Sequence, residues 1–143
     1  MARILVADDD AQCVGLLCRI GRRAAADVEV TTAADGREAL ESLSARPFDL
    51  AILGEEMPGM TGVQVIRCLR RRGVPTPVLL ITGRPTPELT RQACAVGAVD
   101  LQEKPLMPLH VLGLVRKTLL QPANQRKARG RRSAPARRPD ANG

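Results

Sequence analysis

The 143-residue chain has almost no aromatic side chains: Phe48 stands alone, and there is neither tryptophan nor tyrosine. This argues against RNA- and single-strand-binding modules, which stack nucleobases on aromatic rings. The chain also lacks an apolar run near the about 18 residues that a membrane-spanning helix needs. Three aspartates at 8–10 interrupt the N-terminal region where a signal peptide would be apolar. We therefore expect a cytoplasmic protein with no membrane contact.

Cysteine and lysine are scarce as well. Cys13, Cys18, Cys68 and Cys94 share no CxxC spacing, which predicts reduced thiols rather than a zinc site or a disulfide framework. Only three of the 22 basic residues are lysines, so the position of each lysine is informative.

The net charge of +7 is unevenly distributed along the chain. Residues 1–120 hold 15 basic and 14 acidic side chains, whereas residues 121–143 carry a net charge of +6. The basic residues of this tail are Arg126, Lys127, Arg129, Arg131, Arg132, Arg137 and Arg138. The tail has no apolar periodicity, so we expect one folded domain at 1–120 and a disordered tail at 121–143. Such a tail favours binding to nucleic acid or another polyanion, and a solubilising extension without a specific partner is the alternative.

Short apolar runs alternate with amphipathic segments through the first 120 residues. We expect strands at 4–7, 28–33, 49–53, 78–82 and 99–103. We expect helices at 11–25, 61–72, 87–96 and 108–120, and one more that begins at Asp35, with Glu38 completing a capping box. Strict alternation predicts an α/β fold with a doubly wound, five-stranded parallel sheet and five helices. Ligands of such folds bind at the carboxyl ends of the strands.

Four short motifs directly follow the expected strands. They are the aspartates 8–10, the segment 54–56, the pair 82–83 and the pair 104–105. In this order and spacing, the motifs resemble those of receiver domains of bacterial two-component signalling, over about residues 2–120. The resemblance implies the flavodoxin-like receiver fold and a place in phosphorelay signal transduction.

The resemblance also implies a role for each motif. Asp8 and Asp9 would hold Mg²⁺, Asp9 directly and Asp8 through water, and Glu56 would lend its backbone carbonyl. Oxygen ligands suit this hard cation, which offsets charge on phosphoryl oxygens. Lys104 would bind a phosphoryl oxygen, and Thr82 would offer its hydroxyl and turn inward on activation.

The sequence departs from the family at two positions. Gly54 stands where the phosphoacceptor aspartate is expected, and glycine has no side chain that accepts a phosphoryl group. A substitution introduced to abolish phosphorylation would leave the same sequence. Leu101 stands where many receivers carry tyrosine or phenylalanine. We therefore expect a degenerate receiver, or pseudo-receiver, that requires no cofactor and binds Mg²⁺ weakly if at all.

The two acids after Gly54 allow two interpretations. The carboxylate of Glu56 lies near the rim of the pocket in the family geometry, and its approach to Lys104 would mimic a permanently charged site. Alternatively, Glu55 and Glu56 are solvated loop acids.

The expected function is that of a stand-alone, atypical response regulator that acts by protein–protein interaction and is not an enzyme. One alternative is a conventional phosphorelay receiver that accepts a phosphoryl group at Asp8 or Asp9. Another is a phosphatase of the haloacid dehalogenase type, but Gln12 and Cys13 follow the aspartates where that family carries other residues. Binding of polyanions through the tail is compatible with the first reading.

The resemblance places the partner-binding surface on the fourth helix, the fifth strand and the fifth helix. The same surface is a candidate for a homodimer. Its residues would be Thr90, Arg91, Cys94, Leu101, Glu103, His110 and Val111.

Overall fold

The computed structural model describes residues 1–121, and a sheet of five parallel strands lies at its centre. The strands are β1 (Ala2–Ala7), β2 (Val28–Ala33), β3 (Leu50–Gly54), β4 (Val78–Thr82) and β5 (Asp100–Glu103). Their order in the sheet is β2-β1-β3-β4-β5. Strand order reverses between β1 and β3, and the carboxyl ends of these strands are where ligands bind in folds of this kind. The basic residues of the predicted tail lie outside the described residues.

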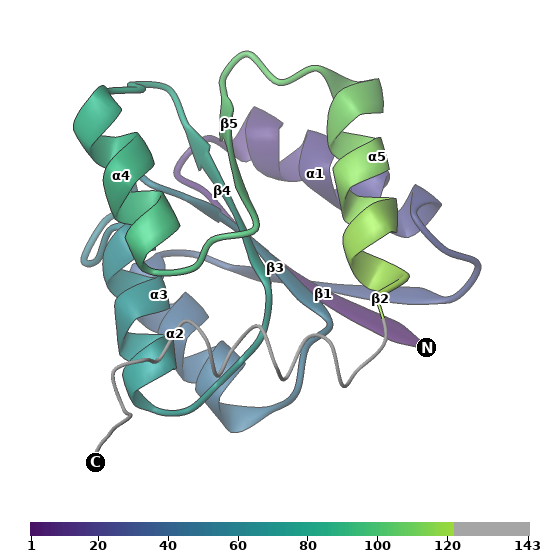
Figure 1. Ribbon diagram of the computed structural model, residues 1–143. Coiled ribbons are helices and arrows are strands. Elements are labelled where there is room, and N and C mark those ends of the chain that lie inside the picture. The colour runs from purple at the N-terminus through teal and green to yellow at the C-terminus, as the bar shows by residue number, and fades with distance from the viewer. Residues whose placement is uncertain (122–143) are drawn as a thin grey trace.

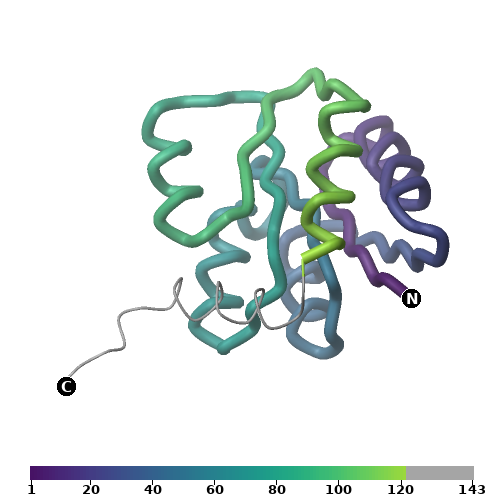
Figure 2. The backbone as a smooth tube through the Cα atoms, turned by 45° about the vertical axis from the view of Figure 1, so that its right-hand side comes forward, coloured from purple at the N-terminus to yellow at the C-terminus, as the bar shows by residue number. Residues whose placement is uncertain are grey.

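Five helices cover the two faces of the sheet. They are α1 (Ala11–Arg23), α2 (Gly36–Ala45), α3 (Gly62–Arg71), α4 (Pro87–Ala95) and α5 (Pro108–Leu119). Helices α1 and α5 lie on one face, and α2, α3 and α4 lie on the other (Figure 1). The rotated view of Figure 2 again shows α1 and α5 side by side. The predicted doubly wound α/β fold with five strands and five helices is thus confirmed.

Each central strand sends alternate side chains into two separate apolar cores. Ile4 and Val6 of β1 pack in the core beneath α1 and α5, whereas Leu5 and Ala7 pack in the core beneath α2, α3 and α4. Because both faces of the sheet are covered, the strand sequence is a continuous apolar run instead of an alternating one. The result is a rigid platform that fixes the positions of the residues after each strand.

Side-chain caps fix where several helices begin. Asp10 accepts the N–H of Gln12 at 2.9 Å at the start of α1. Asp35 caps α2 as predicted, but the carboxylate of Glu38 reaches the N–H of Ala34, one residue before the cap. The predicted capping box is therefore only half correct. A complete box forms instead at the start of α3, between Thr61 and Gln64.

The boundaries of the elements follow the sequence closely. Strands 28–33 and 78–82 are correct to the residue, and β1 begins two residues earlier than predicted because Ala2 pairs with Val28 of β2. Val111 of α5 was expected on the partner surface. It is instead fully buried and belongs to the core between α5, α1 and the sheet. Within residues 1–121, no helix has the length and apolar character needed to cross a bilayer.

Candidate functional site

The predicted site residues meet at one edge of the sheet. Asp8 directly follows β1, Gly54 ends β3, Thr82 ends β4 and Lys104 follows β5. Because the strands are parallel, their carboxyl ends lie at the same edge of the sheet, and the four positions lie together there.

An ion pair joins the residues that follow β1 and β5. Lys104 Nζ lies 2.7 Å from Asp8 Oδ2 and 3.7 Å from Asp9 Oδ1. The Asp8 side chain is completely buried, whereas that of Lys104 is 20% exposed. Burial acts to lower the pKa of Lys104, but the hydrogen bond and charge of Asp8 outweigh it, so that this pKa lies above its ordinary value. Lys104 therefore stays charged at neutral pH.

Gly54 makes room for the carboxylate of Asp8. A Cβ atom at position 54 would overlap Asp8 Oδ1 and would lie 3.0 Å from Asp8 Cγ and 3.3 Å from Asp8 Cα. Asp8 Oδ1 itself is buried and has no hydrogen-bond partner. The Asp8 side chain thus fills the space that any side chain at position 54 would need.

The second carboxylate of the site is that of Glu56, and it binds the end of β4. Thr82 Oγ1 donates to Glu56 Oε2 at 2.6 Å, and the N–H of Gly83 donates to Glu56 Oε1 at 3.1 Å. Both predictions for this residue are therefore wrong, because Glu56 neither approaches Lys104 nor stands free in solvent. The Glu56 carboxylate is taken up by Thr82 and Gly83 at the end of the neighbouring strand β4, and Lys104 pairs instead with Asp8 and Asp9.

Thr82 is held in place from two sides. Its side chain is fully buried, and its hydroxyl oxygen also accepts the N–H of Arg84 at 3.0 Å. The hydroxyl donates its hydrogen to Glu56 and accepts the N–H of Arg84, so it has one defined orientation. Leu101 is half-buried in β5 and packs against the core on the α4 side.

Glu55 points away from the pocket into the start of α3. Its Oε1 accepts the N–H of Val63 at 2.9 Å, and its own N–H donates to the carbonyl of Ile81 at 2.7 Å. Burial raises the pKa of the Glu55 carboxyl, although the hydrogen bond from Val63 works in the opposite direction. Glu55 is thus held at the start of α3 and does not take the place of a side chain at position 54.

Cys13 is a neighbour of the site that the sequence did not reveal. It lies in the first turn of α1, and burial followed by the charge of Asp8 raises the pKa of its thiol to about 11. Its position three residues after Asp10, on the buried face of α1, is the signal that points to it. The thiol is therefore protonated at neutral pH and inert as a nucleophile. Of the other cysteines, Cys94 is exposed.

The carboxylate oxygens at this edge do not form a complete set of Mg²⁺ ligands. Asp8 Oδ2 already accepts Lys104 Nζ and the N–H of Asp10, and Asp8 Oδ1 faces the backbone of Gly54. Within the described part of the chain, no group of three or more His, Cys, Asp or Glu side chains is arranged to hold a metal ion. The ammonium of Lys104 supplies the positive charge that a cation would supply.

The residues predicted for the partner surface are mostly accessible. Thr90, Arg91, Cys94, Glu103 and His110 are exposed. Leu101 is half-buried, and Val111 is buried and cannot contact a partner.

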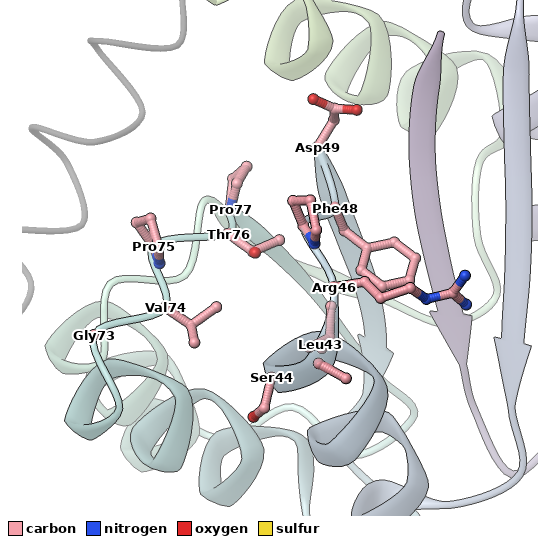
Figure 3. A pocket seen from close by; sticks show the side chains of 12 residues that line it. Leu43, Ser44, Arg46, Phe48, Asp49, Gly73, Val74, Pro75, Thr76 and Pro77 are labelled. Carbon is pink, nitrogen blue, oxygen red and sulfur yellow. The ribbon is translucent and has the colours of Figure 1, made fainter.

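A cavity of about 420 Å³ lies at the opposite, amino-terminal edge of the sheet (Figure 3). It is bounded by the loops that precede β3 and β4, with Phe48 on one side and Pro75 on the other. The buried guanidinium of Arg70 donates to the carbonyls of Val74 and Thr76 at 2.9 and 3.0 Å. Arg70 thereby holds one wall of this cavity, which has no part in the site described above.

The chain is also similar in sequence to known proteins. The family described as "Response regulator receiver domain" matches residues 4–116. The chain is 32% identical over 117 residues to the alkaline phosphatase synthesis transcriptional regulatory protein PhoP of Bacillus subtilis, with 82% of this chain and 48% of PhoP covered. It is 33% identical over 117 residues to the transcriptional regulatory protein PrrA of Mycobacterium tuberculosis, with 82% of this chain and 49% of PrrA covered. The chain thus spans about half the length of these two relatives.

Solved structures give the same result. The receiver domain of the putative response regulator NarL from Mycobacterium tuberculosis is 32% identical, with a TM-score of 0.75 over 82% of this chain and 95% of that one. The chemotaxis protein CheY4 of Vibrio cholerae is 33% identical, with a TM-score of 0.73 over 82% of this chain and 98% of that one. The sequence matches and the structural matches therefore point to the same family of domains.

Proposed function

Because the chain belongs to the response regulator receiver domain family of two-component signalling, we propose that it signals by binding partner proteins and works without phosphorylation at position 54. It has no catalytic activity of its own in this proposal, needs no cofactor and binds Mg²⁺ weakly. A cytoplasmic location and the predicted surface of α4, β5 and α5 belong to the same proposal.

One observation supports this proposal above the others. The carboxylate of Glu56 accepts both the hydroxyl of Thr82 and the N–H of Gly83. These donors stand at the end of β4, where the family resemblance expects Thr82 to respond to a phosphoryl group. With Glu56 in place, the chain supplies the anion for these donors itself.

The surroundings of Gly54 support the same reading. The position has no side chain to receive a phosphoryl group, and Asp8 occupies the space beside it. Lys104, the remaining cation of the site, is already paired with Asp8. Phosphorylation at Asp8, one form of the alternative, would have to break this buried pair, which costs about 3–5 kcal/mol when one partner is removed.

Amide NMR spectra of the labelled chain test the proposal. We expect acetyl phosphate and Mg²⁺ to leave the resonances of Thr82 and Gly83 unchanged, since Glu56 already holds both donors. Glu56→Gln should shift both resonances without any phosphodonor, because the charge on the acceptor is lost. Changes at Thr82 and Gly83 that need both acetyl phosphate and Mg²⁺ in the unchanged chain would contradict the proposal.

A matched variant separates the missing acceptor from the rest of the pocket. Gly54→Asp restores a carboxylate, provided that the side chain of Asp8 rotates away from the space it now fills. We expect this variant to be stabilised against heat by millimolar Mg²⁺, because three close carboxylates repel until a cation offsets them. The unchanged chain should show almost no such stabilisation. Strong stabilisation by Mg²⁺ of the unchanged chain would show that the site holds the ion after all.

A further inference from the structure

The cavity at the amino-terminal edge of the sheet has the size and lining of a small-molecule site. Its volume of about 420 Å³ lies within the range of about 300–1,000 Å³ that is usual for ligand pockets. Leu43 and Phe48 line it from α2 and the loop after this helix, and Val74, Pro75 and Pro77 line it from the loop before β4 (Figure 3). A molecule that enters this cavity therefore meets mainly apolar side chains.

The residues that line the cavity differ in exposure, so that it has an exposed rim and a recessed floor. Pro47 and Pro75 are exposed, whereas Leu43, Phe48 and Pro77 are buried. A broad protein surface would rest on the rim and leave most of the floor uncovered. A small molecule reaches the floor and buries its own apolar surface there.

Arginines outnumber acidic residues around the cavity. Arg46 lines it, and Arg72 donates to the hydroxyl of Ser44, another lining residue, at 2.9 Å. Of the described residues that line it, Asp49 alone is acidic, and its carboxylate accepts the N–H of Arg3 at 2.8 Å. Within residues 1–121, neither Arg46 nor Arg72 forms an ion pair with a carboxylate. The surroundings of the cavity are therefore positive on balance.

A third arginine lies behind the wall of the cavity, and it is buried. Arg70 is 9% exposed, and its Nη1 donates to the carbonyls of Val74 and Thr76, both of which line the cavity. Its Nε is buried without a hydrogen-bond partner, and no carboxylate of residues 1–121 forms an ion pair with it. Burial lowers the pKa of Arg70 to about 10, so the guanidinium stays charged at neutral pH. A buried cation without a counter-ion is unfavourable, and an anion in the cavity would reduce this cost.

From these features we propose that the cavity binds a small amphipathic anion, such as a carboxylic acid with an aliphatic or aromatic body. The apolar body would lie against Phe48 and Val74, and the carboxylate would lie at the rim beside Arg46. Arg70, behind the wall, and Arg72 would add attraction over a longer distance.

Charge selects this occupant over others. The basic tail of this chain, with a net charge of +6 over residues 121–143, would be repelled by the arginines around the cavity. Nucleic acid would be attracted by them but has no apolar part that fits the floor. The inference goes beyond the proposed function, because the cavity shares no residue with the pocket at Gly54 and Glu56.

Titrations of the full labelled chain, followed by amide NMR, test the inference. The probe is decanoate, a linear carboxylate, below the concentration at which it forms micelles. We expect saturable shifts of the amide resonances of Phe48, Val74 and Thr76, which line the cavity. The matched probe without charge, 1-decanol, should bind about tenfold more weakly. Decyltrimethylammonium, the matched cation, should not bind detectably.

Two variants separate the charge of the rim from the space inside the cavity. Arg46→Glu should weaken decanoate binding about tenfold and leave the affinity for 1-decanol unchanged. Ala45 lines the cavity and is exposed, so Ala45→Trp takes up cavity space without disturbing the core and should weaken the binding of both probes about tenfold. Arg19→Glu is the matched control and should change neither affinity, because α1 lies on the other face of the sheet.

Arg70→Met tests the buried charge in the same way. It should weaken the binding of decanoate about threefold more than that of 1-decanol. The ratio of the two affinities is informative even where the loop before β4 shifts, because both probes contact the same wall.

Three results would overturn the inference. The first is the absence of saturable shifts at the amides that line the cavity. The second is equal affinity for decanoate and 1-decanol, which would identify an apolar groove without selectivity for anions. The third is decanoate binding that Arg46→Glu and Ala45→Trp leave unchanged, since the probe would then bind elsewhere on the chain.

Discussion

The carboxylates of Asp8 and Glu56 take up donors that a phosphorylated side chain at position 54 would otherwise meet. Asp8 holds Lys104, and Glu56 holds Thr82 and Gly83. Each contact is charge-assisted, and such hydrogen bonds are about twice as strong as neutral ones. At the scale of single residues, Lys104, Thr82 and the N–H of Gly83 are therefore already paired with carboxylates of the chain itself.

Removal of the Glu56 carboxylate should therefore destabilise the chain. Glu56→Ala leaves the buried hydroxyl of Thr82 without its acceptor, and we expect the free energy of unfolding to fall by about 1.5–3 kcal/mol, as for the loss of one hydrogen bond to a charged group. Urea denaturation measures the change. Glu41→Ala, an exposed position on α2, is the control and should change stability by no more than about 0.5 kcal/mol. Equal free energies of unfolding for Glu56→Ala and the unchanged chain would show that the contact with Thr82 does not stabilise the fold.

The buried thiol of Cys13 should make the chain sensitive to alkaline pH. Its pKa in the folded chain is about 11, above the ordinary value of about 8.5. A raised pKa contributes stability that is complete below the unfolded value and is lost as pH rises through the folded value. We expect this loss between about pH 8.5 and pH 11, and urea denaturation over that range measures it.

The control for this effect is Cys13→Ala, which should remove part of the alkaline loss and leave the part that comes from Lys104. Alkylation at pH 8 provides a second readout, in which exposed Cys94 should react well before Cys13. Equal rates of alkylation at these two cysteines would contradict the buried, protonated state of Cys13.

At the scale of secondary structure elements, the ends of β1 and β3 are matched to each other. Gly54 lies beside Asp8, and a side chain at position 54 would enter the space of the Asp8 carboxylate. A change at one strand end should therefore alter the effect of a change at the other.

A double-mutant cycle measures this coupling. Gly54→Ala should cost about 1–3 kcal/mol, because overpacking displaces the buried Asp8 from Lys104. Asp8→Ala removes the side chain in the way, so adding Gly54→Ala to it should cost much less than Gly54→Ala alone. Unfolding in urea of both single variants and the double variant gives the coupling energy. Strict additivity would show that Asp8 and position 54 do not compete for space.

The elements show how far sequence reasoning reaches. Strands β1, β3 and β4 were predictable because they are buried and contain continuous apolar runs. The set of residues at the carboxyl edge followed from this, since parallel strands end together. The pairing within the set was not predictable from motif order alone. Glu56 and Thr82 pair because β3 and β4 are neighbours in space, and that neighbourhood comes from the sheet order β2-β1-β3-β4-β5.

Other features depend on side-chain detail that the sequence does not carry. The replacement of a side chain at position 54 by the carboxylate of Asp8 arises from one rotamer in a tight space. The burial of Val111 depends on how α5 rotates against the sheet, and a shift of one position on the helix moves a side chain from the surface to the core.

At the scale of the whole molecule, charge divides the chain into two parts. Residues 1–120 are nearly neutral with a net charge of +1, and residues 121–143 carry +6. A compact domain and a strongly basic segment in one chain predict a binding contribution from the segment that is independent of the pocket.

The basic segment should bind polyanions in a salt-dependent manner. We expect the full chain to bind duplex DNA with a log–log salt slope of up to about −6, since each phosphate neutralised by its seven basic residues contributes about −0.9. Replacing these seven residues with glutamine should abolish most of the binding and flatten the slope. Titrations at two salt concentrations measure both quantities. Equal affinity of the two chains would contradict a role for the segment.

The central claim is that this receiver domain works without accepting a phosphoryl group. Intact mass after incubation with acetyl phosphate and Mg²⁺ tests it most directly, with Gly54→Asp incubated in parallel to show what a restored acceptor does. The account predicts an unchanged mass for the chain as it stands, because Gly54 offers no nucleophile and Asp8 is buried against Lys104. A high-yield gain of one phosphoryl group by the unchanged chain, mapped to Asp8, Asp9 or Glu56, would contradict it.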